Sequence, residues 1–146
     1  MSAIITIAQQ KGGAGKTTLA VQLATAMRQA GKTVAVVDID PQASLTAWVR
    51  LREHEARDAA ELRFSMDGVW RLGDELDRLK CDVERNVVDS PPHAESDAKG
   101  AIKAADLVLV PCQPSPLDIW ASKSTVDIAV NDGKRAALVP VSYTHL

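Results

Sequence analysis

The sequence has little cysteine, no long apolar run and no strong excess of charge. Its two cysteines, Cys81 and Cys112, lie far apart without the spacing of metal ligands, so we expect reduced thiols that form neither a disulfide framework nor a cysteine-bound metal site. No stretch approaches the ~20 apolar residues of a membrane span, and the first residues show no signal-peptide pattern. A net charge of −2 gives no general attraction to nucleic acid or anionic lipid, although a local basic patch is compatible with it. These absences predict a soluble, cytoplasmic protein with no membrane partner.

The order of apolar runs and helical patterns predicts the fold class. At 146 residues, 46% of them hydrophobic and 25% charged, the chain has the size and composition of one globular domain. The expected strands are Ala3–Ala8, Thr33–Asp38, Val83–Asp89, Leu107–Val110 and Ala136–Val139, with a short edge strand at Leu62–Met66. The expected helices are Thr17–Ala30, a stretch around Leu45–Leu51, Val69–Leu79, Ala94–Ala105 and Leu117–Val130. This alternation predicts a doubly wound α/β fold with a mostly parallel sheet, whose ligands bind at the carboxyl ends of the strands.

A glycine-rich loop between the first strand and the first helix has the pattern of a phosphate site. It reads Lys11-Gly12-Gly13-Ala14-Gly15-Lys16-Thr17-Thr18. Its glycines let consecutive backbone N–H groups point inward, where the helix N-terminus adds positive potential. Lys16 is suited to reach the β- and γ-phosphates of a nucleotide, and the Thr17 hydroxyl to bind Mg²⁺. The flanking strand and helix argue against the alternative, a surface turn that contains these residues by chance.

Three aspartates end neighbouring strands, with Asp38 and Asp40 after the second long strand and Asp89 after the third. Because the carboxyl ends of parallel strands meet at one edge of the sheet, we expect these side chains beside the phosphate loop. Asp89 is the first candidate ligand for Mg²⁺ and Asp40 a second. Asp38 or Asp40 would position the attacking water or take its proton. The alternative role of a strand-end cap or turn former applies to any one of the three.

The fourth long strand is followed by a proline-rich segment, residues 111–118, in which Pro111, Pro114 and Pro116 occur within six residues. The fixed φ and missing N–H of proline predict a stiff extended loop in place of a helix or central strand. Three interpretations remain open. In the first, Pro114 and Pro116 contact the base of a bound nucleotide. In the second, the loop contacts another subunit. In the third, the prolines only set the conformation of the backbone.

Three motifs, residues 11–18, Asp38-x-Asp40-Pro41-Gln42 and Asp89-x-Pro91-Pro92, together resemble those of the ParA/MinD family of ATPases with a deviant Walker A loop. The resemblance covers about residues 3–139, and residues 40–48 and 114–118 are similar to the small, ParF-like partition ATPases in particular. It implies a Mg²⁺-dependent P-loop ATPase that dimerises on ATP and drives the segregation of plasmid or chromosomal DNA. The implied partners are a centromere-binding ParB-type protein, which stimulates hydrolysis, and nonspecific DNA on the nucleoid.

The resemblance also gives a role to a lysine that the general phosphate loop does not require. The general pattern needs glycine at position 10, where this chain has Gln10, and Lys11 stands at the mouth of the loop. In the family the extra lysine crosses the dimer interface to the nucleotide of the other subunit. There it would stabilise charge in the transition state, as an arginine finger does.

The sequence departs from the family at two places. Gln9 stands where the family often has asparagine, and residues 141–146 do not continue the family pattern of further strands and a C-terminal helix. We therefore expect an ATPase domain at residues 1–140 that lacks its C-terminal part, followed by an unrelated tail at residues 141–146. The basic residues that bind DNA in the family lie largely in that part.

Three other functions are compatible with the same loop. The first is a MinD-like spatial regulator of cell division on a membrane, which needs a C-terminal amphipathic helix with basic residues. Another is a metallocentre ATPase similar to the nitrogenase iron protein, in which cysteines of two subunits share a cluster. This function is disfavoured because Cys81 should not reach the same subunit interface as Cys112. The last is an inert, truncated fragment that binds nucleotide weakly or not at all.

Overall fold

The computed structural model describes residues 1–55, 62–66, 68–92 and 95–141 of the chain. Of the predicted tail, only residue 141 falls within this part, and residues 142–146 lie outside it. Within the described residues, no helix is both long and apolar enough to span a lipid bilayer.

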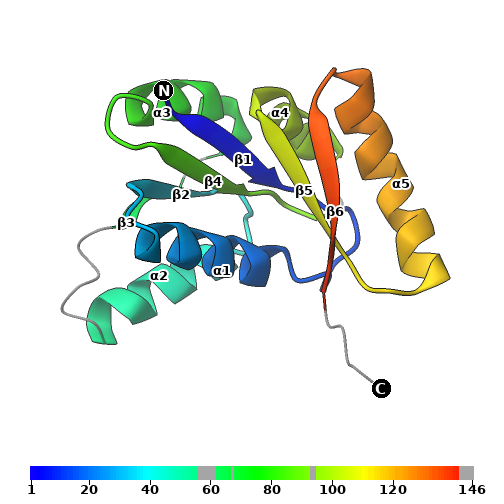
Figure 1. Cartoon of the computed structure of the whole chain (residues 1–146), viewed down its shortest axis with the longest axis horizontal. Helices are drawn as coiled ribbons and strands as arrows, with labels where there is room; N and C mark the ends of the chain where they lie inside the picture. The colour runs from blue at the N-terminus through cyan, green and yellow to red at the C-terminus, as the bar shows by residue number, and fades with distance from the viewer. Residues whose placement is uncertain (56–61, 67, 93–94, 142–146) are drawn as a thin grey trace.

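A parallel sheet of six strands forms the centre of the molecule, in the order β3-β2-β4-β1-β5-β6 (Figure 1). The strands are β1 (Ala3–Ile7), β2 (Val34–Asp38), β3 (Leu62–Met66), β4 (Arg85–Asp89), β5 (Leu107–Cys112) and β6 (Arg135–Pro140). The register pairs Asp38 with Asp89 across β2 and β4, and Ile7 with Asp89 across β1 and β4. The ends of these three strands therefore lie level at one edge of the sheet.

Helices cover both faces of the sheet. They are α1 (Lys16–Gln29), α2 (Ser44–Glu55), α3 (Leu72–Leu79), α4 (Glu95–Ala104) and α5 (Pro116–Asn131), with a 3₁₀ turn η2 (Val69–Arg71) before α3. Helices α1 and α2 pack with Ile5, Ile7 and Val36 on one face. Helices α3, α4 and α5 pack on the other, where Ile4 and Val37 meet α3 and Val108 meets α4 and α5. This two-sided packing confirms the predicted doubly wound α/β fold.

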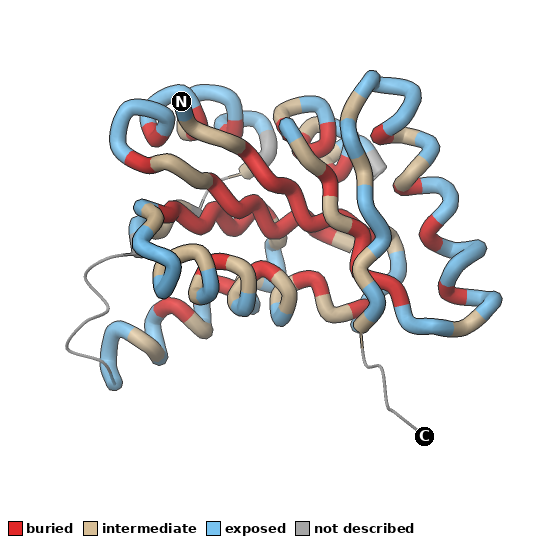
Figure 2. The backbone as a smooth tube through the Cα atoms, in the orientation of Figure 1, coloured by how far each residue is buried: buried red, intermediate tan, exposed pale blue. Residues whose placement is uncertain are grey.

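The strands in the middle of the sheet are buried because helices cover both of its faces, and their residues are therefore mostly apolar. Residues 34–38 of β2 are all buried, and so are residues 4–7 of β1. Strand β6 differs, since only Ala136 and Val139 are half-buried there and its other four residues are exposed (Figure 2). The helix predicted at residues 69–79 begins as the 3₁₀ turn and becomes α-helical at Leu72.

The prediction of a stiff extended loop over residues 111–118 is wrong. Strand β5 includes Pro111 and continues to Cys112, and α5 begins at Pro116. The carbonyl of Leu109 accepts a hydrogen bond from Ala8 N, and that of Pro111 accepts one from Gln9 Nε2. Both residues thus face β1, whose pairing with β5 covers only Leu107–Leu109. Pro111 lies past that pairing, so its missing N–H removes no hydrogen bond from the ladder.

Pro116 is tolerated in α5 for a related reason. It occupies the first turn of the helix, where a backbone N–H has no partner within the helix. Ser115 precedes it as the N-cap, and its Oγ accepts a hydrogen bond from Asp118 N at 3.2 Å. Pro111 thus lies one residue before the end of β5 and Pro116 begins α5, with only residues 113–115 between the two elements.

Candidate functional site

The glycine-rich loop connects β1 to α1, as the sequence predicts. Gly13 and Gly15 have φ values of 70° and 87°, a left-handed conformation that glycine adopts without steric cost. Gly15 is the N-cap of α1 and offers no side chain to its first turn. The N–H groups at the start of α1 are therefore not capped by a side chain, and they are suited to bind an anion.

A cavity of about 380 Å³ opens at this loop. It is lined by residues 13–18 together with Asp40, Gln42, Ser44 and Pro92. Six predicted nucleotide-binding residues and one predicted catalytic aspartate thus share one cavity. Gly12, Pro114 and Pro116 are not part of its lining, and their contact with a nucleotide stays a prediction. The other three lining residues, Gln42, Ser44 and Pro92, were not predicted as site residues, although each follows a predicted aspartate within four residues.

Lys16 points inward from the start of α1 and is 7% exposed. Its Nζ lies 3.4 Å from the carbonyl oxygen of Lys11, which closes the loop on itself. Burial lowers the pKa of Lys16, while the nearby carboxylates of Asp89 and Asp40 raise it in part. The lysine is thus held at the floor of the loop with carboxylates near it.

Thr17 and Asp89 are brought together from α1 and β4. The Thr17 hydroxyl donates a hydrogen bond of 2.6 Å to Asp89 Oδ2, and the other oxygen, Oδ1, is buried without a hydrogen-bond partner. Burial raises the pKa of Asp89 to about 6, although the Thr17 hydrogen bond lowers it. Asp38 and Asp40 add a smaller increase through their negative charge.

These donors fit a Mg²⁺ ion that arrives with a nucleotide. Mg²⁺ prefers oxygen ligands and is bound by one or two carboxylates together with waters and phosphates. Thr17, the unpaired oxygen of Asp89 and the cavity-lining Asp40 supply such ligands. Within the described residues, no three His, Cys, Asp or Glu side chains converge as a metal site. The protein ligands alone are few, so phosphate oxygens would have to complete the coordination.

The two aspartates after β2 have different surroundings. Asp38 is 1% exposed and accepts hydrogen bonds from Asp40 N at 3.0 Å, Thr46 N at 2.9 Å and Thr46 Oγ1 at 2.7 Å. Asp40 is half-buried and accepts one from Gln42 N at 2.9 Å. Asp40 therefore faces the cavity, while Asp38 joins the end of β2 to the first turn of α2. Which of them acts on the attacking water stays a prediction.

Lys11 has a partner that the sequence does not reveal. Its Nζ forms an ion pair with Asp118 Oδ1 in the first turn of α5. The Ser115 hydroxyl donates to the other oxygen, Asp118 Oδ2. The hydrogen bonds from Lys11 and from Ser115 lower the pKa of Asp118. The two partners are 107 residues apart in the chain, and no local pattern connects them.

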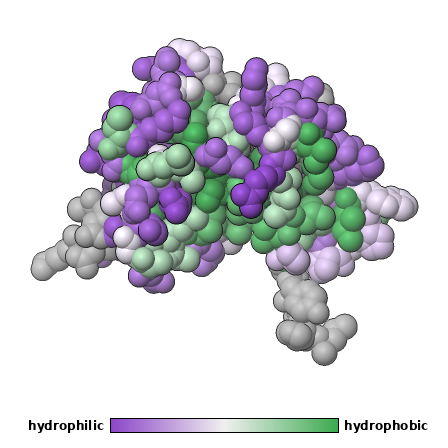
Figure 3. All heavy atoms as spheres, turned by 45° about the horizontal axis from the view of Figure 1, so that its top comes forward, coloured by the Kyte–Doolittle hydropathy of each residue, from purple (hydrophilic) through white to green (hydrophobic). Residues whose placement is uncertain are grey.

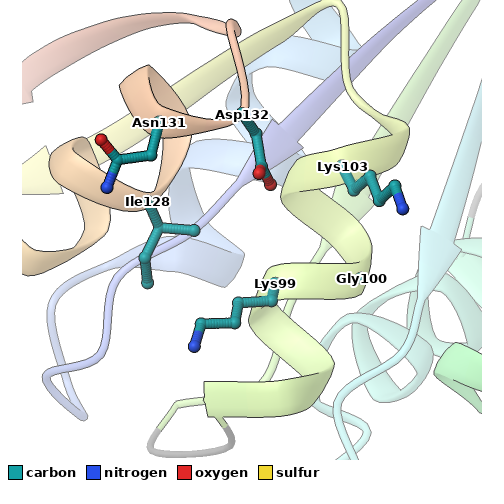
Figure 4. A pocket seen from close by; sticks show the side chains of 6 residues that line it. All are labelled: Lys99, Gly100, Lys103, Ile128, Asn131 and Asp132. Atoms are coloured by element: carbon teal, nitrogen blue, oxygen red, sulfur yellow. The ribbon is translucent and has the colours of Figure 1, made fainter.

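A second cavity, of about 330 Å³, lies between α4 and α5 (Figure 4). Its lining residues are Lys99, Gly100, Lys103, Ile128, Asn131 and Asp132. Three of these residues lie in the second half of α4 and three at or just after the end of α5, on the side of the molecule where α5 leads into β6. In Figure 4 the side chains of Lys99 and Lys103 leave α4 in opposite directions, so the two lysines do not converge on one centre.

Comparison with known proteins agrees with this geometry. Residues 5–129 match the CobQ/CobB/MinD/ParA nucleotide binding domain. The maintenance of carboxysome distribution protein A of Halothiobacillus neapolitanus is 34% identical over 143 residues, which cover 92% of this chain and 64% of that protein. Protein ParA of Rhizobium radiobacter is 34% identical over 129 residues, which cover 88% of this chain and 57% of that protein.

The solved structures agree on the fold. Cobyrinic acid a,c-diamide synthase from Mycobacterium smegmatis, with bound ADP and magnesium, superposes with a TM-score of 0.82 at 19% identity. The match covers 98% of this chain and 75% of that chain, and at this identity it shows the shared fold alone. The chain spans 64% of the length of the Halothiobacillus neapolitanus protein and 57% of the length of protein ParA of Rhizobium radiobacter.

Proposed function

Because the chain belongs to the CobQ/CobB/MinD/ParA family of nucleotide-binding proteins, we propose that it is a Mg²⁺-dependent ATPase that dimerises on ATP and drives the partition of a cellular cargo. One observation carries the proposal. The Thr17 hydroxyl and the buried carboxylate of Asp89 meet at 2.6 Å beside the floor of a phosphate loop. A threonine after the loop lysine and an aspartate at a strand end are the protein ligands of the metal in phosphate-loop nucleotidases.

The residues of the site would divide the work as follows. The N–H groups of the loop and Lys16 bind and orient the β- and γ-phosphates. Thr17, Asp89 and Asp40 would hold Mg²⁺, which offsets the negative charge of the phosphates when bound. Asp40 or Asp38 orients the attacking water through its carboxylate. Lys11 would leave Asp118 and contact the nucleotide of a second copy, where it stabilises charge that develops in the transition state.

The cargo that we propose is plasmid or chromosomal DNA, with a ParB-type protein as the partner that stimulates hydrolysis. The 34% identity to protein ParA of Rhizobium radiobacter supports this choice. An equal identity to a carboxysome distribution protein favours a second candidate, the positioning of a large protein assembly. Both cargoes use the same ATPase cycle, so the site itself does not distinguish them.

Two lysine variants test the ATPase and the role of Lys11 separately. At a concentration 100 times its Kd, Mg·ATP should stabilise the wild-type chain by about 2.7 kcal/mol in thermal unfolding. The variant Lys16→Ala should lose this stabilisation. In contrast, Lys11→Ala should keep it and lose stimulated hydrolysis by on the order of 10³-fold or more, as for a missing arginine finger.

The matched control is Lys32→Ala, since Lys32 pairs with Glu84 at the far end of the sheet. This variant should bind and hydrolyse ATP like the wild type. The ATPase proposal fails if Mg·ATP stabilises neither wild type nor control. The cross-subunit role fails if Lys11→Ala keeps its stimulated turnover.

A further inference from the structure

Gln9 is a buried amide that lies two residues after the end of β1 and two residues before Lys11. It is 3% exposed, and its Nε2 donates hydrogen bonds to the carbonyl oxygen of Pro111 at 3.0 Å and to Ser122 Oγ at 2.8 Å. Both hydrogens of the amide nitrogen are thus used, one on β5 and one on α5. The other amide atom, Oε1, is buried and accepts no hydrogen bond from a described residue.

The unpaired oxygen of Gln9 shows that this amide adds little net stability to the fold. A buried polar atom without a partner costs free energy, which offsets part of the gain from the two hydrogen bonds of Nε2. Methionine is unbranched, has nearly the same length and would fill the space without an unpaired oxygen. Proteins keep such imperfectly satisfied groups where a function needs a fixed position.

The contacts of Gln9 belong to a chain of interactions that returns to the phosphate loop. Ser122 Oγ, which accepts from Gln9, donates to the carbonyl oxygen of Asp118 at 2.8 Å. The carboxylate of Asp118 in turn pairs with Lys11. The chain therefore leaves the main chain at residue 9, passes through α5 and comes back at residue 11, so both ends of this short segment are held by the same helix.

The same segment touches the lysine that is suited to bind the phosphates. The carbonyl oxygen of Lys11 lies 3.4 Å from Lys16 Nζ, and Lys16 is expected to reach the β- and γ-phosphates. Gln9 thus acts on Lys16 through the backbone of the loop. When Lys11 leaves Asp118, as the proposed function requires, the contacts of Gln9 with β5 and α5 still hold the start of the loop.

Helix α5 has a polar buried side, as this contact requires. Its buried residues are Asp118, Ser122, Thr125 and Ala129, although a surface helix normally buries its apolar side. In Figure 3 hydrophobic side chains reach the surface on the α5 side, between hydrophilic ones. In the first half of α5, polar contacts with the start of the phosphate loop therefore take the place of apolar packing.

We propose that Gln9 is a positioning residue of the phosphate loop, which fixes the loop backbone and Lys16 against β5 and α5 in a conformation ready to bind phosphate. The inference rests on the proposed function, because it takes the loop to be a nucleotide site. A loop that is already ordered before its ligand arrives loses less conformational freedom on binding. The hydrogen bonds of Gln9 should therefore raise the affinity for nucleotide more than they raise the stability of the fold.

The experiment compares nucleotide affinity with the stability of the nucleotide-free protein. Titration calorimetry with Mg·ADP measures the affinity without hydrolysis. Gln9→Met should bind Mg·ADP on the order of 10-fold more weakly, because the charge-assisted hydrogen bond from Lys16 to phosphate is weakened. Its Tm without nucleotide should shift by no more than ~5 °C. Ser122→Ala should weaken binding too, and the double variant should bind no more weakly than Gln9→Met, because both residues act through one contact.

The matched control is Asn86→Leu. Asn86 is 0% exposed, its Nδ2 donates to Ser2 Oγ at 2.8 Å, and its Oδ1 is also buried without a partner among the described residues. It lies near the start of β4, at the edge of the sheet opposite the phosphate loop, so Asn86→Leu should bind Mg·ADP like the wild type.

The outcomes separate this inference from the proposed function. Wild-type affinity in Gln9→Met overturns the inference, and so does an equal loss of affinity in Asn86→Leu, which would reflect a general loosening of the fold. If Gln9→Met does not fold, Ser122→Ala decides, and its wild-type affinity overturns the inference. A wild type that binds neither Mg·ADP nor Mg·ATP instead overturns the proposed function.

Discussion

Asp89 is a buried carboxylate that costs stability and is suited to bind a cation. It is 1% exposed, and one of its carboxylate oxygens has no hydrogen-bond partner. A buried charge without full compensation is costly, and the group lowers this cost by binding a proton more tightly. Burial accordingly raises the pKa of Asp89 to about 6. A bound cation would offset the same cost. We therefore expect Asp89 to lower the free energy of unfolding of the nucleotide-free protein, and bound Mg²⁺ to reverse this effect.

The pH dependence of stability tests this view. The folded pKa of Asp89, about 6, lies above its ordinary value of 3.8, so folding favours the protonated form. Its contribution to stability is complete below about pH 4 and is lost as the pH rises through 6. Relative to the wild type, Asp89→Asn should therefore gain about 1–1.5 kcal/mol in free energy of unfolding between pH 5 and 7.5.

Urea unfolding without nucleotide at both pH values measures this difference. The variant should also lose much of the stabilisation by Mg·ATP, since a neutral amide binds Mg²⁺ more weakly than a carboxylate. A constant difference between the two proteins across this pH range would contradict the proposed cause.

Among the helices and strands, α2 and α5 each begin next to a polar side chain that binds the backbone N–H groups of the first turn. Asp38 at the end of β2 accepts hydrogen bonds from the N–H and hydroxyl of Thr46 in the first turn of α2. It thereby acts on α2 as a capping residue does, although it is six residues before the helix starts. Ser115 caps α5 from the adjacent position. The turn that carries Asp40 to the cavity is thus held in place by Asp38.

Comparing alanine variants of the two aspartates tests this division of roles. Asp38→Ala leaves two buried donors of Thr46 without their acceptor, so it should lower the free energy of unfolding by about 2–4 kcal/mol. Asp40→Ala removes one hydrogen bond from a half-buried site and should cost at most about 1 kcal/mol. Urea unfolding without nucleotide measures both. Equal losses would mean that Asp38 does not organise α2.

At the scale of the whole molecule, the sheet has one edge that is poorly covered. Within the described residues β6 pairs with β5 alone, and Leu138 on it is 47% exposed. An exposed apolar edge strand can pair with the edge of another molecule. None of the residues that line the cavity at the phosphate loop lies in β6, so association through this edge would not depend on ATP.

Placing a charge on this edge should suppress such association. Leu138→Lys should reduce concentration-dependent light scattering without nucleotide, because lysine on an edge strand opposes pairing. Its effect on the free energy of unfolding should stay within about 0.5 kcal/mol, as for other surface substitutions. The control Leu51→Lys alters an equally apolar residue, 57% exposed on α2, and should leave scattering unchanged. Equal effects of both variants would mean that general charge, and not the edge, controls association.

The sequence alone determined the features that depend on neighbours along the chain. Apolar runs predicted the strands and Lys11–Thr18 predicted the phosphate loop, because side-chain alternation, glycine conformations and helix starts follow from local sterics and hydrogen bonds. The convergence of Asp38, Asp40 and Asp89 was also predictable, since parallel strands bring their carboxyl ends to one edge.

Only the tertiary structure decided contacts between distant segments. The pairing of Lys11 with Asp118, the orientation of Asp38 toward Thr46 and the place of Pro111 past the end of β1 pairing depend on strand order and register. The polar contacts of α5 belong here too, because its residues 118, 122 and 124 find partners in residues 9–11, more than a hundred positions away. Packing of the whole sheet sets these distances, and no local pattern encodes them.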